Sequence, residues 1–147
     1  MLLAMALALG CAARDRARVV TPSAIADVDR LCRAHPIADD ANIRADLLAR
    51  SDAASIHLVQ VRGAEAPHRH AVHDLAVTVL RGEGTLRLGD TVQTVRAGDV
   101  TLVPRGVVHW FTRTGAETAV TVAVFSPPLD APDFVPAADV DSPATAR

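Results

Sequence analysis

The sequence contains no lysine, and all 15 of its basic residues are arginines. The arginines are scattered among 17 acidic residues, so the formal net charge is only −2. A protein that binds nucleic acid usually concentrates positive charge on one face, and the sequence has no such concentration. We therefore expect no nucleic-acid partner.

Long hydrophobic runs and aromatic residues are also scarce. No apolar run approaches the ~20 residues that a membrane-spanning helix needs, and the aromatic residues are three phenylalanines and one tryptophan. Half of the 147 residues are nevertheless hydrophobic, which supports a sizeable core and excludes a wholly disordered chain. With nine prolines and eight glycines, the composition predicts one turn-rich domain rather than a long helical bundle.

Cysteine occurs only twice, which is too few for a cysteine-rich structural zinc site. Cys11 follows the apolar run Leu2–Leu9 and Gly10, an arrangement typical of a secretory signal. The segment ending at Cys11 resembles a bacterial lipobox, which implies that residues 1–10 are a signal peptide and that Cys11 is lipidated. That resemblance places the protein in a bacterial cell envelope, anchored to the membrane. Two alternatives remain open: a Cys11–Cys32 disulfide outside the cytoplasm, and a buried N-terminal element with an incidental cysteine.

Residues 11–42 are predicted to be a tether that contains a short helix. Thr21, Pro22 and Ser23 suit a helix start, and apolar residues at helical spacing continue the pattern to about residue 34. We therefore expect a helix over 23–34.

Residues 43–127 have a different pattern, with short alternating or apolar segments between glycines and prolines. The segment 43–49 fits either a helical turn or a strand, and we favour a strand. The other expected strands are 56–61, 75–80, 85–88, 91–95, 100–103, 108–112 and 119–125. This spacing is typical of an all-β antiparallel sandwich or barrel. Residues 128–147 are rich in proline, aspartate and alanine and are predicted to be a disordered tail.

Histidines mark a candidate metal site within the expected barrel. His68 and His70 are two residues apart, so their side chains lie on the same face of an extended strand. His109 lies on another expected strand, and His73 and Asp74 follow the first pair. Such a donor set suits a divalent transition metal, namely Mn, Fe, Ni, Cu or Zn. The alternative is a group of solvated loop histidines.

The residues around these histidines resemble the two signature motifs of the cupin superfamily, G-x5-H-x-H-x3,4-E-x6-G and G-x5-P-x-G-x2-H-x3-N. The first motif is matched at His68, His70 and Gly82. The second is matched at Gly98, Pro104, Gly106 and His109. The departures are Gly63, which lies one residue too close to the first histidine, and Arg113, which replaces the final asparagine. The resemblance implies a jelly-roll barrel, also called a double-stranded β-helix, whose histidines bind a metal.

The fourth metal ligand is left open by the motif. Counting forward from His70 leads to Asp74, whereas counting back from Gly82 leads to Leu75, which cannot bind a metal. We expect Asp74 to complete the set, with His73 as the alternative. A site of only the three histidines is the third possibility. Arg113 is a candidate for binding the carboxylate of a substrate.

The resemblance implies a metal-dependent enzyme for a small molecule, either a dioxygenase or an isomerase. The alternative is a non-catalytic module that captures a small ligand or a metal at the cell surface. Glu65 and Glu83 lie in expected turns, so no separate general acid or base is predicted. Many small cupins pair through their sheet edges, which implies a homodimer.

Overall fold

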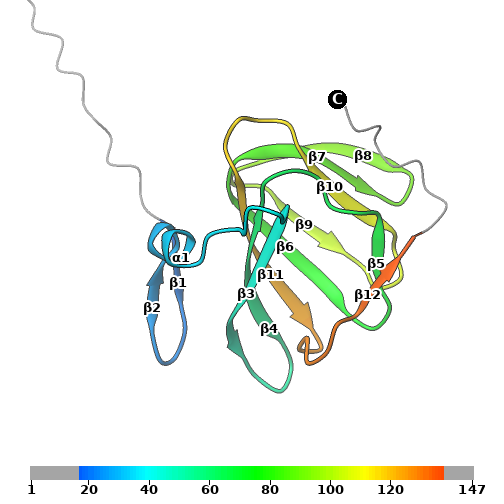
Figure 1. Ribbon diagram of the computed structural model, residues 1–147. Helices are drawn as coiled ribbons and strands as arrows, with labels where there is room; N and C mark the ends of the chain where they lie inside the picture. Colours follow the sequence, from blue (N-terminus) through cyan, green and yellow to red (C-terminus); the bar gives the residue numbers. More distant parts are fainter. Residues whose placement is uncertain (1–16, 138–147) are drawn as a thin grey trace, which may run out of the picture. The chain divides into compact units, whose positions relative to one another are not determined.

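The computed structural model describes residues 17–137, and the chain divides into two compact units at residue 34 (Figure 1). The predicted signal peptide and the lipidation site Cys11 lie outside the described residues. Within residues 17–137, no helix is long and apolar enough to cross a membrane.

The N-terminal unit consists of a small hairpin and one short helix. Strand β1 (Arg18–Val20) pairs with β2 (Ile25–Asp27), and α1 (Val28–Ala34) follows directly. The side chain of Asp27 accepts a hydrogen bond from the Arg30 amide at 2.8 Å and so caps the helix start. The predicted helix over 23–34 is therefore wrong in its first part, because Ile25–Asp27 pairs with β1 in the hairpin.

The second unit contains two five-stranded antiparallel sheets, as the strand pattern predicts. The first sheet contains, in spatial order, β12 (Phe134–Pro136), β5 (His68–His70), β10 (His109–Arg113), β7 (Glu83–Leu88) and β8 (Thr91–Arg96). The second contains β3 (Ile43–Arg50), β4 (Ser55–Val61), β11 (Ala119–Ser126), β6 (Asp74–Arg81) and β9 (Val100–Val103). This architecture confirms the predicted all-β jelly-roll fold.

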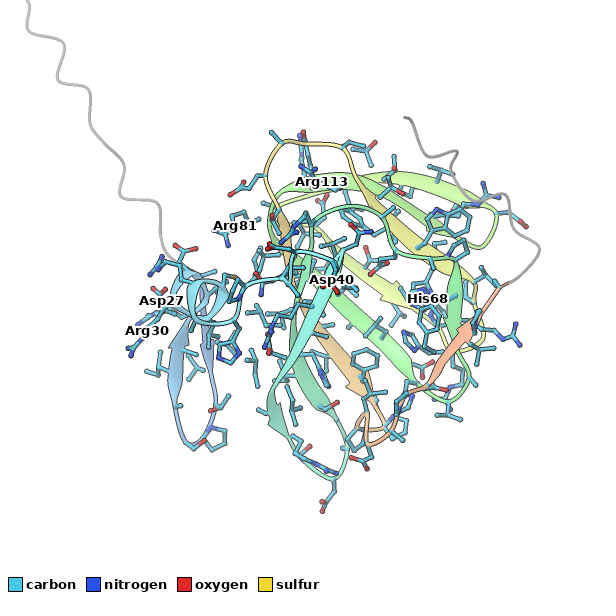
Figure 2. All side chains as sticks on the ribbon, in the orientation of Figure 1. Asp27, Arg30, Asp40, His68, Arg81 and Arg113 are labelled. Carbon is cyan, nitrogen blue, oxygen red and sulfur yellow. The ribbon has the colours of Figure 1, made fainter. Side chains whose placement is uncertain are left out.

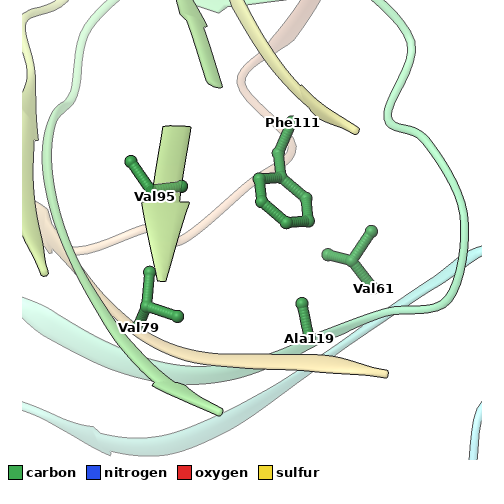
Figure 3. Packing of buried hydrophobic residues seen from close by; sticks show 5 residues of the cluster. All are labelled: Val61, Val79, Val95, Phe111 and Ala119. Carbon is green, nitrogen blue, oxygen red and sulfur yellow. The ribbon is translucent and has the colours of Figure 1, made fainter. Parts of the chain in front are cut away.

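Side chains from both sheets meet in the interior of the barrel. One buried cluster joins residues of β4, β6, β8, β10 and β11, namely Val61, Val79, Val95, Phe111 and Ala119 (Figure 3). The burial of these apolar surfaces away from water gives the main favourable free energy that holds the two sheets together.

The turn between β6 and β7 depends on Gly82. Its φ is +78°, and a Cβ at this position would lie 2.8 Å from the Cα of Ala119. Glycine is therefore required here for its backbone conformation and for the close approach of β11.

The predicted tail differs from the structure over Phe134–Pro136, which forms β12 along the outer edge of β5. Pro136 has no amide hydrogen, but an edge strand tolerates a proline. Residues 138–147 of the predicted tail lie outside the described residues.

Candidate metal site

Three of the candidate histidines come together at one end of the first sheet. His68 and His70 lie on β5, and His109 is the first residue of β10, where it pairs directly with His68. One ring nitrogen from each histidine lies within 4.8 Å of the others. Figure 2 labels His68, which lies on β5 beside β12.

Hydrogen bonds to the backbone orient all three imidazole rings. The Nδ1 of His68 lies 2.8 Å from the Ala66 carbonyl, and the Nδ1 of His109 lies 3.0 Å from the Val107 carbonyl. The Nδ1 of His70 lies 3.3 Å from the backbone carbonyl of Asp133, in residues 127–137, which we call the C-terminal segment. Because a carbonyl only accepts, each Nδ1 must donate its hydrogen, and each Nε2 keeps a free lone pair.

Burial keeps these rings uncharged at neutral pH. Desolvation lowers the pKa of His68 and of His70, and it lowers the pKa of His109 to about 4. The hydrogen bonds to the carbonyls oppose this effect but do not overcome it. Neutral imidazole is the form that binds a metal.

The donor set therefore fits a divalent transition metal. Three neutral imidazoles with fixed Nε2 lone pairs are the ligands that borderline metals prefer, and a second hydrogen bond on each ligating ring is usual in metal sites. His68, His70 and His109 would hold the metal.

Asp74 is not brought to these histidines. Its carboxylate accepts hydrogen bonds from the Arg105 amide at 2.9 Å and from the Arg105 guanidinium at 2.7 Å. The bonds from Arg105 lower the pKa of Asp74 to about 2. The carboxylate is thus engaged by Arg105 at the barrel surface, where its side chain is 41% exposed.

His73, the alternative fourth ligand, is also engaged elsewhere. Its Nδ1 lies 2.5 Å from the Asp133 carboxylate, and its Nε2 lies 3.3 Å from the Pro128 carbonyl. Both ring nitrogens therefore face the C-terminal segment. Among the described residues, the structure assembles three candidate ligands and no fourth.

Arg113, the candidate for substrate binding, lies at the other end of β10 from His109 (Figure 2). Its guanidinium donates hydrogen bonds to the backbone carbonyls of Arg62 and Gly115. It is not among the cavity-lining residues. The structure thus uses this side chain to tie two loops to β10.

The histidines open into a cavity of about 370 Å³ inside the barrel. Most of the cavity wall is aliphatic or aromatic, contributed by residues such as Val59, Val77, Leu86 and Phe125. Phe134 of β12 also lines it and stacks on His68, with ring centroids 4.4 Å apart. A cavity of this size accepts a small molecule.

Glu65 is a cavity residue that the sequence places in a turn. Its Oε2 accepts a hydrogen bond from the Phe111 amide at 2.9 Å, and its own amide donates to the Phe111 carbonyl at 2.9 Å. Burial raises the pKa of Glu65 to about 7, although the Phe111 amide opposes the rise. Sequence reasoning missed Glu65 as a cavity residue. Its place three residues before His68 was the one sign that it lies near the site, and that place does not show which way the side chain points.

The comparisons with known proteins agree with this geometry. Residues 55–125 match the family model of the cupin domain, Cupin_2. An uncharacterized protein of Aquifex aeolicus (strain VF5) is 42% identical over 78 residues, which is 53% of this chain and 64% of the relative. The chain thus covers less than two thirds of that relative's length.

Solved structures show the same fold at low sequence identity. A protein with a double-stranded β-helix domain from Klebsiella pneumoniae has a TM-score of 0.60 and 22% identity over 69% of this chain and 88% of its own. A cupin-2 domain protein from Shewanella frigidimarina has a TM-score of 0.50 and 25% identity over 55% of this chain and 78% of its own. These structures share the barrel fold of the chain, and residues 55–125 are similar to a cupin domain.

Proposed function

Because residues 55–125 match the cupin domain, we propose that the protein is a metal-dependent enzyme of the cupin superfamily. It binds one divalent transition metal through the Nε2 atoms of His68, His70 and His109. The metal supplies Lewis acidity and open coordination positions for a small molecule in the cavity. The reaction is an isomerisation or a dioxygenation of that molecule.

The observation that carries this proposal is the common orientation of the three imidazoles. Each Nδ1 is committed to a backbone carbonyl, and one ring nitrogen from each histidine lies within 4.8 Å of the others. Ordinary core histidines have no reason to share this arrangement. The adjoining apolar cavity gives the metal a place at which to meet a substrate.

Elemental analysis and calorimetric titration of chelator-stripped full-length protein without a His tag test the proposal. We expect one equivalent of Mn, Fe, Ni, Cu or Zn per chain, with a dissociation constant in the micromolar range or below. Protein that takes up none of these metals contradicts the proposal. If metal binds but a broad screen for O₂ uptake and isomerisation finds no turnover, the protein is the non-catalytic binding module instead.

We also propose that the protein is a lipoprotein of a bacterial cell envelope. The support is the apolar run Leu2–Leu9 followed by Gly10 and Cys11. Stable anchoring needs more than one acyl chain, which bacterial lipoproteins carry. Wild-type protein should sediment with membranes and Cys11→Ser should not, whereas wild-type protein recovered wholly in the supernatant with an intact Met1 contradicts the proposal.

A homodimer is proposed on the resemblance to small cupins that pair through sheet edges. Strands β3 and β9 end the second sheet, so each has one unpaired side among the described residues. Exposed apolar side chains lie on both, including Leu47 and Leu102, and such edges favour association. Light scattering that finds only monomer at high protein concentration contradicts this proposal.

A further inference from the structure

We propose that Glu65 is the acid–base residue of the cavity, and that it moves a proton on a small, mainly apolar carbonyl compound. This inference rests on the proposed function and deepens it, because it selects proton-transfer isomerisation over oxidation.

The position of Glu65 is fixed by β10, the strand that also carries His109. Two backbone hydrogen bonds tie residues 63–65 to this strand, one from the Arg113 amide to the Gly63 carbonyl and one from the Glu65 amide to the Phe111 carbonyl. Together they form the bridge between Ala64 and Thr112. The Glu65 carboxyl then accepts a hydrogen bond from the Phe111 amide. Phe111 lies two residues from His109, a separation of about 7 Å along a strand. A small molecule can therefore reach from the histidines to this carboxyl.

Among the other side chains that line the cavity, Glu65 is the best candidate for an acid–base group. Besides the three histidines of the metal site, the titratable groups among the described lining residues are Glu65 and His57. The Nε2 of His57 is bonded to the Ser55 hydroxyl at 2.9 Å. Among residues 17–137, the Phe111 amide is the only hydrogen-bond donor to the Glu65 carboxyl. No buried side-chain oxygen of the described residues lacks a partner, so the other carboxyl oxygen is accessible.

The walls of the cavity define the class of ligand. They contain no arginine among the described residues, so an anionic group has no cation there other than a bound metal. Aliphatic and aromatic side chains favour a neutral, mostly hydrocarbon body. A carbonyl oxygen is the polar group that both the metal site and a neighbouring carboxyl can use.

The proposed step conserves atoms and electrons without a co-reactant. For a ketone with a β,γ double bond, the Glu65 carboxylate takes a proton from the carbon between the carbonyl and the double bond, and the electron pair of that C–H bond moves to form a dienolate. The resulting carboxylic acid returns the same proton to the γ carbon, so the double bond moves to the α,β position and the carbonyl is restored. A carboxyl with a pKa near neutrality performs both halves of this exchange.

Glu65→Gln is a suitable test because an amide oxygen can still accept the bond from Phe111. The probe is 2-indanone, a small apolar ketone, in D₂O under argon with zinc-loaded full-length protein. Zinc has no redox chemistry, so loss of the α-protons in proton NMR reports proton transfer alone. We expect the wild type to accelerate exchange, Glu65→Gln to lose about 100-fold or more of that acceleration, and the exposed control Glu83→Gln to match the wild type.

A second measurement does not depend on catalysis. In metal-free wild-type protein, carboxyl carbon NMR should detect one group that titrates near pH 7, and Glu65→Gln should lack it. The folded-state pKa lies above the unfolded value of about 4.3, so unfolding releases a proton between these values. Stability of the wild type should therefore fall relative to Glu65→Gln as pH rises from about 4.5 to 7.

The outcomes separate the two proposals. If both proteins bind zinc and exchange the probe equally, or if wild type with bound zinc does not accelerate exchange, the role of Glu65 is overturned while the metal site stands. A Glu65 carboxyl that titrates near its ordinary pKa also overturns it. If neither protein binds zinc or any of Mn, Fe, Ni and Cu, the proposed function itself fails.

Discussion

His70 and His57 both line the cavity, but their ring nitrogens have different partners. His70 donates from Nδ1 to a backbone carbonyl and belongs to the histidine triad, whereas the Nε2 of His57 is bonded to Ser55. The partner of each ring nitrogen, rather than burial alone, thus separates a candidate ligand from a core histidine.

The histidine pair gives the first prediction. His70→Ala should weaken metal binding by about 100-fold or more, since a ligand contributes at least as much as the residues that orient it. His57→Ala is the matched control and should stay within about threefold of the wild type. Isothermal titration with zinc measures both, and equal losses in the two variants would place the metal elsewhere.

Asp74 gives a prediction about pH. Its folded pKa is about 2, below the unfolded value of about 3.9, so its stabilising effect is complete above that value and disappears as pH falls through 2. The pair with Arg105 is exposed, so Asp74→Asn should lower the melting temperature at pH 7 by at most about 4 °C.

The gap between wild type and Asp74→Asn should narrow as the pH falls below about 3.9 and close only below pH 2, as followed by circular dichroism. Zinc affinity at pH 7 should not differ between the two proteins, because the carboxylate is engaged by Arg105. A large loss of affinity would instead support Asp74 as the fourth ligand.

Sequence patterns predicted the three histidines but not the surroundings of the carboxylates. The spacing of His68 and His70 fixes their common face, because strand periodicity is local. Asp74 meets Arg105 from 31 residues away, and Glu65 meets Phe111 from 46 residues away. Such pairings depend on sheet register, which a single sequence does not reveal.

At the scale of elements, the β6–β7 turn combines a left-handed backbone with a close approach of β11. Gly98 also has a positive φ, of +99°, but a Cβ there meets nothing within 4 Å. A side chain at Gly98 would meet only backbone strain, whereas a side chain at Gly82 would meet the same strain and a steric clash with Ala119. Comparing the two positions therefore separates the two effects.

Gly82→Ala should destabilise the fold by about 2–5 kcal/mol, the sum of backbone strain and overpacking against Ala119. Gly98→Ala carries only the strain and should cost about 1–2 kcal/mol. Urea unfolding of both variants measures the difference, and equal costs would show that the contact with Ala119 relaxes freely.

The C-terminal segment is a second element whose contacts support the site. The Asp133 carboxylate accepts the Ala71 and Val72 amides at 3.1 and 3.0 Å and also contacts His73. Burial raises the pKa of Asp133, but the bonds from His73 and the two amides outweigh it and lower the pKa to about 2. The segment after β5 is thereby held in one conformation.

Asp133→Asn should destabilise the protein by about 1–3 kcal/mol and weaken zinc binding by about 10-fold. An amide side chain has one acceptor oxygen where the carboxylate has two. Asp130→Asn is the control from the same segment. Within residues 17–137 Asp130 forms only an exposed pair with Arg50, so this change should have little effect. Thermal melts and zinc titration check both, and indistinguishable variants would contradict the support role.

The C-terminal segment also contains β12, a strand that the sequence did not predict. The barrel strands follow from alternating residues and intervening glycines, which are local signals. Phe134–Pro136 has a proline and lies among aspartates and prolines, so composition predicted a tail. Its strand conformation comes from pairing with β5, which is more than 60 residues away.

At the scale of the whole molecule, the strand of the candidate metal site pairs with two strands that lie far from it in the sequence. β5 has only three residues and pairs with β10 on one side and β12 on the other. Until residues 134–136 pair with it, one edge of the strand that carries His68 and His70 is open to water and to strands of other chains. A strand more than 60 residues away thus both closes this edge and places Phe134 against His68.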